Sequence, residues 1–391
     1  MGAQRLTCRI GTGFSTSASA WDAATEAARS ARGEARADTP VDLAFLFLSP
    51  GHLDDAGAAA EAVQEELSAR HLVGCVAEGV VARARELEEG PAAAVWAAAL
   101  PGADVECFHL QAGQTDDGIA VAGLPQLDDP ALVSLLVDPF TFPTGAFLSG
   151  LNERYERIPL VGGIAVGGRE PGRQALILDD AVHADGAVGA VVSGLPVVTV
   201  VSQGCRPIGR EAVVTRCEGN VVHELAGKPA LERLRDEITA LSPEEQTLAA
   251  RGLLVGVVID ENRPEYDTGD FLMRGLLGAD ETTGALALGD NVRVGQTLRF
   301  FVRDAASADA DLRRALGGLS GPGRATGALL FTCNGRGTNM FAEPDHDAKL
   351  VAEALGTEAL AGYFCGGEIG PVGGKVFLHG FTATLAVFLD R

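Results

Sequence analysis

Three stretches of the chain show the same order of an apolar strand, a polar elbow, a helix, a glycine-rich elbow and a return strand. The glycine-rich elbows read VGCVAEG at residues 73–79, VGGIAVGG at 161–168 and GYFCGGEIG at 362–370. The opening strands are Leu43–Leu48, Leu132–Val137 and Leu329–Phe331, and the return strands are Ala93–Leu100, Ala175–Leu178 and Thr382–Leu389. We interpret the order as an internal repeat produced by duplication, with ordinary α/β periodicity as the alternative. Either interpretation excludes an all-α protein.

Length and composition set the domain organisation. A chain of 391 residues, 47% of them hydrophobic and 21% charged, is expected to form two or three packed units with a large core. We predict a boundary near Asn220, which gives a domain over residues 1–219 and a second over 220–391. The predicted class is α/β (mixed α+β), with two pseudo-repeated halves and mixed β-sheets covered by helices. A partial fourth copy of the repeat is predicted to start at Leu253.

The charge of the chain limits its partners. A formal net charge of −22 argues against nucleic acid and against an anionic membrane surface. The longest apolar run, residues 92–100, is too short to span a bilayer, and the first twenty residues lack the pattern of a signal peptide. The seven cysteines form no CxxC pair, and we interpret them as reduced thiols. We therefore predict a cytoplasmic protein.

The C-terminal elbows offer the strongest candidate site. Arg336 follows the strand 329–331, and Glu368 lies in the next glycine-rich elbow. A guanidinium group binds a carboxylate through two hydrogen bonds, and a carboxylate accepts from an ammonium group. With Asn334 and Asn339 nearby, the two elbows are predicted to bind both ends of an amino-acid-like zwitterion. The alternative is a structural ion pair between Arg336 and Glu368 that braces the elbows.

The predicted ligand-binding residues share a position on a glycine-rich elbow or beside one. Arg336 would bind an anionic group, Glu368 a cationic group, and the glycines would present peptide N–H groups. Under this hypothesis Arg336→Ala removes ligand binding and leaves the fold intact, whereas unfolding would favour the structural ion pair. The full set is Asn334, Arg336, Gly337, Asn339, Cys365, Gly366, Gly367 and Glu368, with Cys75 and Glu78 from the first half.

Other chemistries have weaker support in the sequence. Cys333 or Cys365 beside Arg336 would have a lowered pKa and act as a nucleophile, with His346, His379 or Glu368 as the base, whereas an inert buried cysteine is the commoner case. The spacing of Cys333, His346 and Cys365 matches no compact zinc pattern. No phosphate-binding GxxxxGK[ST] motif is present, and Gly11-Thr12-Gly13 lacks the third glycine of a dinucleotide motif. We predict no cofactor, no metal and no catalytic residue.

The C-terminal elbows also carry a family resemblance. Residues 333–337 (CNGRG), followed after a helix by 366–371 (GGEIGP), resemble the signature of the FIST C-terminal domain. Residues 269–274 (GDFLMR), and the run from Gly295-Gln296 to Arg303-Asp304, are similar to its earlier blocks, and 73–75 with 161–163 resemble the FIST N-terminal domain. The resemblance covers about residues 30 to 390. It implies a cytoplasmic, two-part α/β sensory module for small molecules such as amino acids.

The leading hypothesis is thus a stand-alone, non-enzymatic sensor of an amino-acid-like small molecule that acts on an unidentified signalling protein. The first alternative is a cysteine-dependent enzyme acting on a small molecule. The second is a protein-interaction adaptor without a ligand, because relatives of this family are joined to signalling domains or to an F-box.

Overall fold

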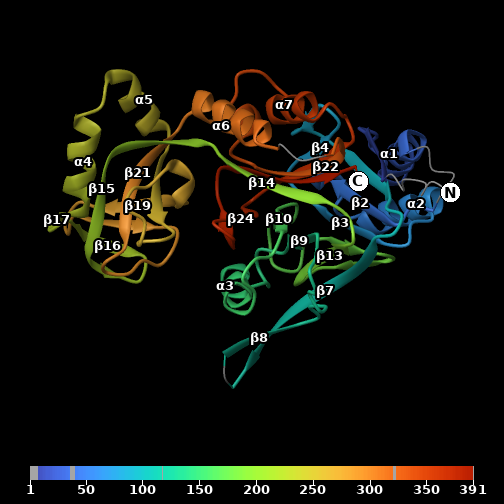
Figure 1. Ribbon diagram of the computed structural model, residues 1–391, viewed down its shortest axis with the longest axis horizontal. Helices are drawn as coiled ribbons and strands as arrows, with labels where there is room; N and C mark the ends of the chain where they lie inside the picture. Colours follow the sequence, from blue (N-terminus) through green and yellow to red (C-terminus); the bar gives the residue numbers. More distant parts are fainter. Residues whose placement is uncertain (1–7, 36–39, 117, 320–322, 391) are drawn as a thin grey trace. The chain divides into compact units, whose positions relative to one another are not determined.

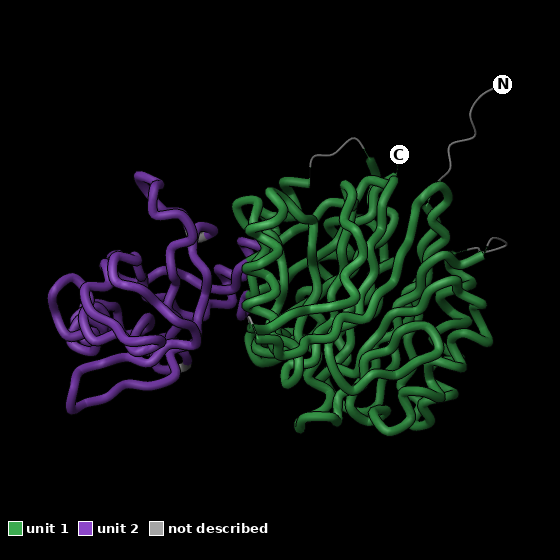
Figure 2. The backbone as a smooth tube through the Cα atoms, turned by 90° about the horizontal axis from the view of Figure 1, so that it is seen from below, with its two compact units in different colours: residues 1–202, 313–378, 382–391 green, residues 203–312, 379–381 purple. Residues whose placement is uncertain are grey.

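The computed structural model describes residues 8–35, 40–116, 118–319 and 323–390. It has two compact units, one comprising residues 1–202, 313–378 and 382–391, and the other 203–312 and 379–381 (Figure 2). Unit 1 contains three mixed sheets with helices, and unit 2 contains an antiparallel barrel (Figure 1). The predicted mixed α+β class and two-part architecture are confirmed. The boundary at 219/220 stays a prediction.

The first segment of unit 1 runs from residue 9 to residue 99. Its strands β2 and β3 are parallel, with helix α2 between them, and β6 pairs with β2 in the antiparallel direction. Its elements are β1 (Arg9–Ser15), α1 (Ala20–Ala35), β2 (Leu43–Leu48), the 3₁₀ turn η1 (Pro50–His52), α2 (Ala56–Leu67), β3 (Leu72–Val76), β4 (Val80–Ala82), β5 (Arg85–Leu87) and β6 (Ala93–Ala99).

The second segment, residues 104–193, has the same plan. Strands β9 and β10 are parallel around helix α3, and β13 is antiparallel to β9. Its elements are β7 (Asp104–Thr115), β8 (Gly118–Ala122), β9 (Leu132–Val137), α3 (Thr144–Arg154), β10 (Leu160–Ile164), β11 (Leu176–Leu178), β12 (Ala181–His183) and β13 (Ala187–Ser193).

The third segment repeats the plan again but is interrupted in the sequence by unit 2. Strands β22 and β23 are parallel around helix α7, and β26 is antiparallel to β22. Its elements are β14 (Val197–Gln203), β22 (Ala325–Cys333), the 3₁₀ turn η3 (Gly337–Asn339), α7 (His346–Leu355), β23 (Leu360–Cys365), β24 (Glu368–Val372), β25 (Lys375–His379) and β26 (Thr382–Leu389).

Each segment completes the sheet of another segment with a short hairpin. The order β1-β6-β2-β3-β11-β12 shows that the second segment adds its hairpin to the first sheet. In the second sheet, the third segment adds β24 and β25, which gives the order β25-β24-β10-β9-β13-β7-β8. In the third sheet, the first segment adds β4 and β5, which gives the order β14-β26-β22-β23-β4-β5. This cyclic exchange ties the three segments together, since no segment holds all the strands of its own sheet.

The exchange corrects one prediction. The return strand predicted at residues 175–178 does occur, as β11, but it does not lie beside the strand 132–137. Strand β11 pairs with β3 of the first segment, and β13 takes the place beside β9. The apolar pattern of a short strand does not encode which neighbour it pairs with, because that choice depends on tertiary contacts.

Each parallel strand pair contains one glycine at the same register. In every case a Cβ atom on the glycine would lie within 2.2 Å of the carbonyl oxygen of the leucine on the neighbouring strand. The three pairs are Leu46–Gly74, Leu135–Gly162 and Leu330–Gly362. The glycines at these places in the elbow motifs therefore allow a close backbone approach that no other residue permits.

Gly362→Ala is expected to destabilise unit 1 by about 3 kcal/mol or more, at or above the top of the usual range for overpacking. The added Cβ would lie 1.7 Å from the Leu330 carbonyl oxygen, so the strands must separate. Urea denaturation measures the change. Gly145→Ala in helix α3 is the matched control, because its Cβ would meet no atom within 4 Å. Equal stability of the two variants would contradict this account of the register.

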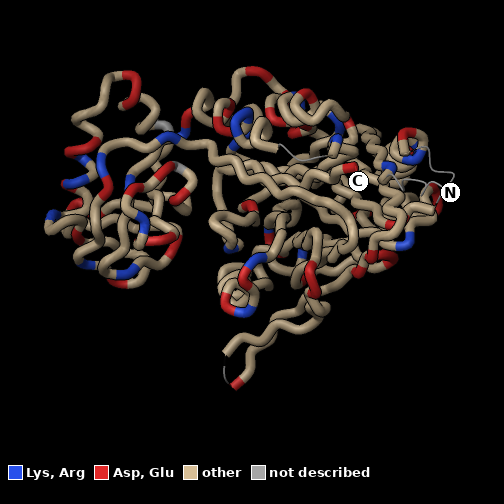
Figure 3. Tube along the Cα trace, viewed as in Figure 1, with Lys and Arg blue, Asp and Glu red and all other residues tan. Residues whose placement is uncertain are grey.

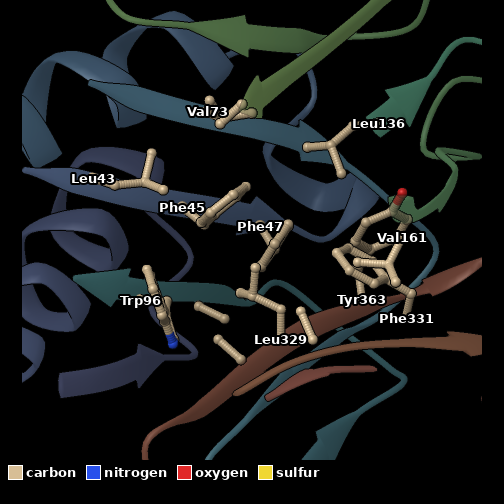
Figure 4. Packing of buried hydrophobic residues seen from close by; sticks show 14 of the residues in the cluster. Leu43, Phe45, Phe47, Val73, Trp96, Leu136, Val161, Leu329, Phe331 and Tyr363 are labelled. Carbon is tan, nitrogen blue, oxygen red and sulfur yellow. The ribbon is translucent and has the colours of Figure 1, made fainter. Parts of the chain in front are cut away.

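The central core of unit 1 joins the sheets of the first and third segments. Figure 4 shows Phe45, Phe47 and Trp96 of the first sheet packed beside Phe331 and Tyr363 of the third. The Phe47 and Tyr363 ring centroids lie 5.3 Å apart, and those of Phe331 and Tyr363 lie 5.5 Å apart. Aromatic pairs at this separation add to the stabilisation from buried apolar area. This packing supports the glycine-rich elbows at the ends of β3 and β23.

Helix α1 covers the outer face of the first sheet next to α2. Its alanine stripe is buried, and a Cβ on Gly11 or Gly13 of β1 would lie 2.1 Å from an α1 carbonyl oxygen. Small side chains on both elements therefore let the helix approach the strand closely.

The second segment has strand β8 and the connection 123–131 where the first segment has α1.

Unit 2 contains a closed barrel. The strands follow the order β15-β21-β18-β19-β20-β16, and a pairing of β15 with β16 closes the ring. Its elements are β15 (Cys205–Glu218), β16 (Val221–Leu225), β17 (Lys228–Pro229), α4 (Ala230–Thr239), α5 (Pro243–Arg251), β18 (Leu253–Val258), η2 (Thr268–Asp270), β19 (Phe271–Asp280), β20 (Ala285–Leu288) and β21 (Thr297–Arg303), followed by α6 (Ala305–Gly317) at its edge.

The barrel overturns the expected fourth repeat. Strand β18 pairs with the antiparallel β19 instead of a parallel partner, and a 3₁₀ turn stands where a helix was expected. A short apolar strand followed by a polar elbow fits both arrangements, so the sequence pattern did not separate them.

Candidate functional site

The glycine-rich elbows of the three segments meet in unit 1. The Ile164 amide donates to the Gly367 carbonyl over 2.8 Å, and the Gly366 amide donates to the Ile164 carbonyl over 3.0 Å. The Phe364 amide donates to the Gly79 carbonyl over 3.0 Å. These bonds join the strand ends that carry Glu78 and Glu368. The structure therefore brings together elbows that lie almost 300 residues apart in the sequence.

Arg336 lies beneath the surface of the elbows rather than at it. Its side chain is fully buried, and its Nε and Nη2 atoms donate to Asp347 Oδ2 and Oδ1 over 2.7 and 2.9 Å. This is the two-pronged geometry that a guanidinium group makes with a carboxylate. The alternative pair with Glu368 is wrong, since the first turn of helix α7 supplies the partner. The Arg336 Nη1 atom is buried without a hydrogen-bond partner in the described chain.

Asp347 is the centre of a buried polar network. It accepts from the Thr332 hydroxyl over 3.0 Å, and its Oδ1 lies 3.0 Å from His346 Nδ1. The His346 ring stacks on Phe341 with centroids 3.6 Å apart, and Arg336 lies over the same ring at 5.4 Å. Burial by itself would raise the pKa of Asp347, but Arg336 and His346 hold it well below its usual range. The carboxylate is thus charged at neutral pH.

Glu368 is also fully buried, with its Oε2 atom accepting from the Thr382 amide over 3.0 Å and from the Thr382 hydroxyl over 2.8 Å. Burial raises the pKa of Glu368 to about 8, although the Thr382 bonds, Cys333 and Arg336 oppose the rise. The carboxyl group is therefore mostly protonated at neutral pH. In this state it is not an anionic site for a ligand ammonium group.

The elbow cysteines do not have the environment of a nucleophile. Cys75 and Cys365 are completely buried, and burial raises the pKa of both thiols. A nucleophilic cysteine needs the opposite, a lowered pKa and an accessible thiolate. The expectation of a lowered pKa is wrong for Cys365. Tyr363 lies between the elbows and donates from its hydroxyl to the Gly163 carbonyl over 2.6 Å.

The accessible part of the site is a small acidic pocket of about 70 Å³. Its lining residues are Glu78, Gly79, Glu88, Asn334, Asn339 and Phe364. The Asn334 side chain donates to Glu78 over 2.9 Å, and the Asn339 side chain donates to the Asn334 carbonyl over 2.8 Å. Since one water occupies about 30 Å³ in the liquid, the pocket has room for a small group such as an ammonium head.

The structure separates the predicted ligand residues into two layers. Glu78, Asn334 and Asn339 line the pocket, and Gly366 is exposed next to Val166. The buried layer consists of Arg336, Gly337, Cys365, Gly367, Glu368 and Cys75. Whether any of them touches a ligand stays a prediction.

Sequence reasoning missed Asp347 and Glu88. Glu88 accepts from the Thr338 amide over 3.0 Å and from the Thr338 hydroxyl over 2.9 Å, and so fixes the turn η3. An acidic residue in the first turn of the helix after an Arg-bearing elbow is a usable signal for Asp347. Glu88 follows β5 and reaches the third segment only through the hairpin exchange, which the sequence does not reveal.

Comparisons with known proteins agree with this architecture. A model of the FIST N domain matches residues 42–228, and a model of the FIST C domain matches residues 230–371. The chain is 47% identical to an uncharacterized protein of Mycobacterium tuberculosis (strain CDC 1551 / Oshkosh) over 386 residues, 98% of this chain and 100% of that protein. It is 45% identical to an uncharacterized protein of Mycobacterium bovis over 388 residues, 98% of this chain and 99% of that protein. In the described part of the chain, no helix is long and apolar enough to cross a membrane.

Proposed function

Because this chain belongs to the FIST family, whose domains are associated with sensory and signalling functions, we propose that it is a sensor of a small molecule carrying an ammonium group. Amino acids are the first class to test. We further propose that it acts in the cytoplasm on a separate signalling protein.

The acidic elbow pocket is the observation that carries the ligand class. Two carboxylates, Glu78 and Glu88, and two side-chain amides, Asn334 and Asn339, face a space of about 70 Å³. Carboxylates and amide oxygens accept hydrogen bonds from an ammonium group. Arg336, which was predicted to bind a ligand carboxylate, is fully buried and does not line the pocket, so the ammonium end is the better supported half of the zwitterion.

The shared strand order of the three sheets supports a duplication origin for unit 1. Under this proposal the three elbows began as equivalent turns. The third segment contributes Asn334 and Asn339 to the pocket lining, and the first contributes Glu78 and Glu88. A ligand that contacts both segments would stabilise the folded state by linkage, which is a means of sensing.

A thermal-shift assay with glycine, lysine, putrescine and acetate tests the proposal. Amines are expected to raise the melting temperature and acetate is not, because a ligand at 100 times its Kd stabilises the fold by about 2.7 kcal/mol. Glu78→Gln is expected to reduce the shift. Glu89→Gln, an exposed neighbour outside the pocket lining, is the control. The proposal fails if no amine shifts the wild type or if both variants respond equally.

A further inference from the structure

A second cavity lies away from the elbows, beside helix α3. It has a volume of about 830 Å³, within the range of about 300–1,000 Å³ that is typical of small-ligand sites. The elbow pocket, with about 70 Å³, admits only one end of a small molecule. The cavity beside α3 is therefore large enough for a whole small molecule.

One wall of this cavity, which we name the α3 groove, is a helical stripe. Ala146, Phe147, Gly150, Leu151 and Arg154 line it at spacings of three and four residues, which place them on one face of α3. Figure 1 shows α3 beside the arm formed by β7 and β8. On the same helix face, Leu151 belongs to the hydrophobic core and Phe147 packs against it, which fixes the position of this wall.

The opposite wall is formed by strand β8 and the connection that follows it. Ile119 and Val121 alternate along β8 and therefore face the same side, and Leu124 and Leu127 continue the apolar surface. Strand β8 carries no charged residue, as Figure 3 shows along the arm. Ile119 is 58% exposed at this apolar surface.

The groove has one unpaired cation at its edge. Arg154 lies over the Tyr155 ring at 5.4 Å, and in the described chain it makes no hydrogen bond or ion pair with another residue. The carboxylate that lines the groove, Asp128, accepts from the Gln126 side chain over 2.9 Å. Arg154 is the cation of this lining, and its guanidinium group suits a carboxylate.

Comparison with the first segment explains why the groove is open. There, helix α1 packs against α2 and covers β1 and β6. Between β7 and β9, the described residues of the second segment form no helix at this place, only β8 and its connection. The face of α3 that corresponds to the α1-covered side of α2 is therefore left with an apolar space beside it.

We propose that the α3 groove is a second ligand site of unit 1, which binds an elongated apolar molecule with a terminal carboxylate. The chain of the ligand lies between the α3 stripe and β8, and its carboxylate pairs with Arg154. This site is independent of the proposed amine pocket, because the two linings share no residue.

Isothermal titration calorimetry with decanoate, decanol and decylammonium tests the proposal. Decanoate is expected to bind more tightly than the other two. Arg154→Gln is expected to weaken decanoate about tenfold to a hundredfold, the loss typical of a charged hydrogen bond, and to leave decanol unchanged. Equal affinity for decanoate in the wild type and in Arg154→Gln would overturn the assignment of the carboxylate.

A pair of variants on one helix tests the location. Gly150 lines the groove and Gly145 does not, yet a Cβ on either glycine would meet no atom within 4 Å. Leucine also favours a helix more than glycine does, so both Gly150→Leu and Gly145→Leu are expected to fold. Gly150→Leu is expected to abolish decanoate binding, and Gly145→Leu to retain it. Retention in both, loss in both, or no binding to the wild type would overturn the proposal.

Glu78→Gln separates this site from the amine pocket. It is expected to leave decanoate affinity unchanged while it reduces the response to amines. If decanoate binding falls with Glu78→Gln but not with Gly150→Leu, the ligand lies at the elbows and the α3 groove is not its site.

Discussion

Replacing Arg336 with methionine is expected to lower the free energy of unfolding by about 3–5 kcal/mol, the usual effect of removing one partner of a buried ion pair. Both side chains of the Arg336–Asp347 pair have no solvent exposure. The substitution leaves the Asp347 charge buried with only Thr332 and His346 beside it. Chemical denaturation at pH 7 measures the loss.

Two further variants separate a buried charge from a general packing effect. Arg85→Met removes a partner of Asp345 from a pair in which Arg85 is 55% exposed, so it is expected to cost at most about 1 kcal/mol. The double variant Arg336→Met with Asp347→Asn removes both charges and is expected to be more stable than Arg336→Met. If Arg336→Met costs no more than Arg85→Met, the buried pair does not stabilise the elbows.

This experiment also decides between the two roles considered for Arg336. A ligand-binding arginine would be replaceable without unfolding, whereas the geometry predicts a large loss of stability. The thermal response to amines, measured on whatever folded protein remains, tests the ligand role separately.

Glu368→Gln is expected to stabilise the protein increasingly as the pH rises from 5 to 8. The pKa of Glu368 is about 8 in the folded protein, against an ordinary value of 4.5. Between these values the folded state holds a proton that the unfolded state has lost, so the stability of the wild type falls with rising pH. The slope that glutamine removes is up to about 1.4 kcal/mol per pH unit.

Glutamine is a suitable replacement because its carbonyl oxygen can accept the two Thr382 hydrogen bonds. Glu86, whose pKa burial and the Asp347 charge raise to about 8, titrates in the same range, so only the difference between the two proteins is informative. Glu353→Gln, at an exposed position on α7, is the control and is expected to show no such pH trend. Parallel stability curves for wild type and Glu368→Gln would contradict a protonated Glu368.

Local structure was predictable wherever the sequence carries a local signal. Strands 43–48, 132–137 and 382–389 occur where the apolar runs place them. The start of α5 carries a capping box of the kind that a local sequence pattern encodes, in which the Ser242 side chain accepts from the Glu245 amide and the Glu245 side chain accepts from the Ser242 amide. These features depend on interactions between residues a few positions apart. The glycine-rich elbows are confirmed only in part, because residues 73–76, 161–164 and 362–365 lie inside strands β3, β10 and β23, which pair with the opening strands of their segments.

The sequence by itself thus determined the opening strands of the segments, the mixed fold class and the family. Only the tertiary structure decided which side chains and which strands pair with one another. Arg336 pairs with Asp347 and not with Glu368, and β4–β5 brings Glu88 to the third segment. The physical reason is that pairing between strands and the burial of a charge depend on which surfaces meet, and any apolar strand edge or carboxylate satisfies the local pattern equally well.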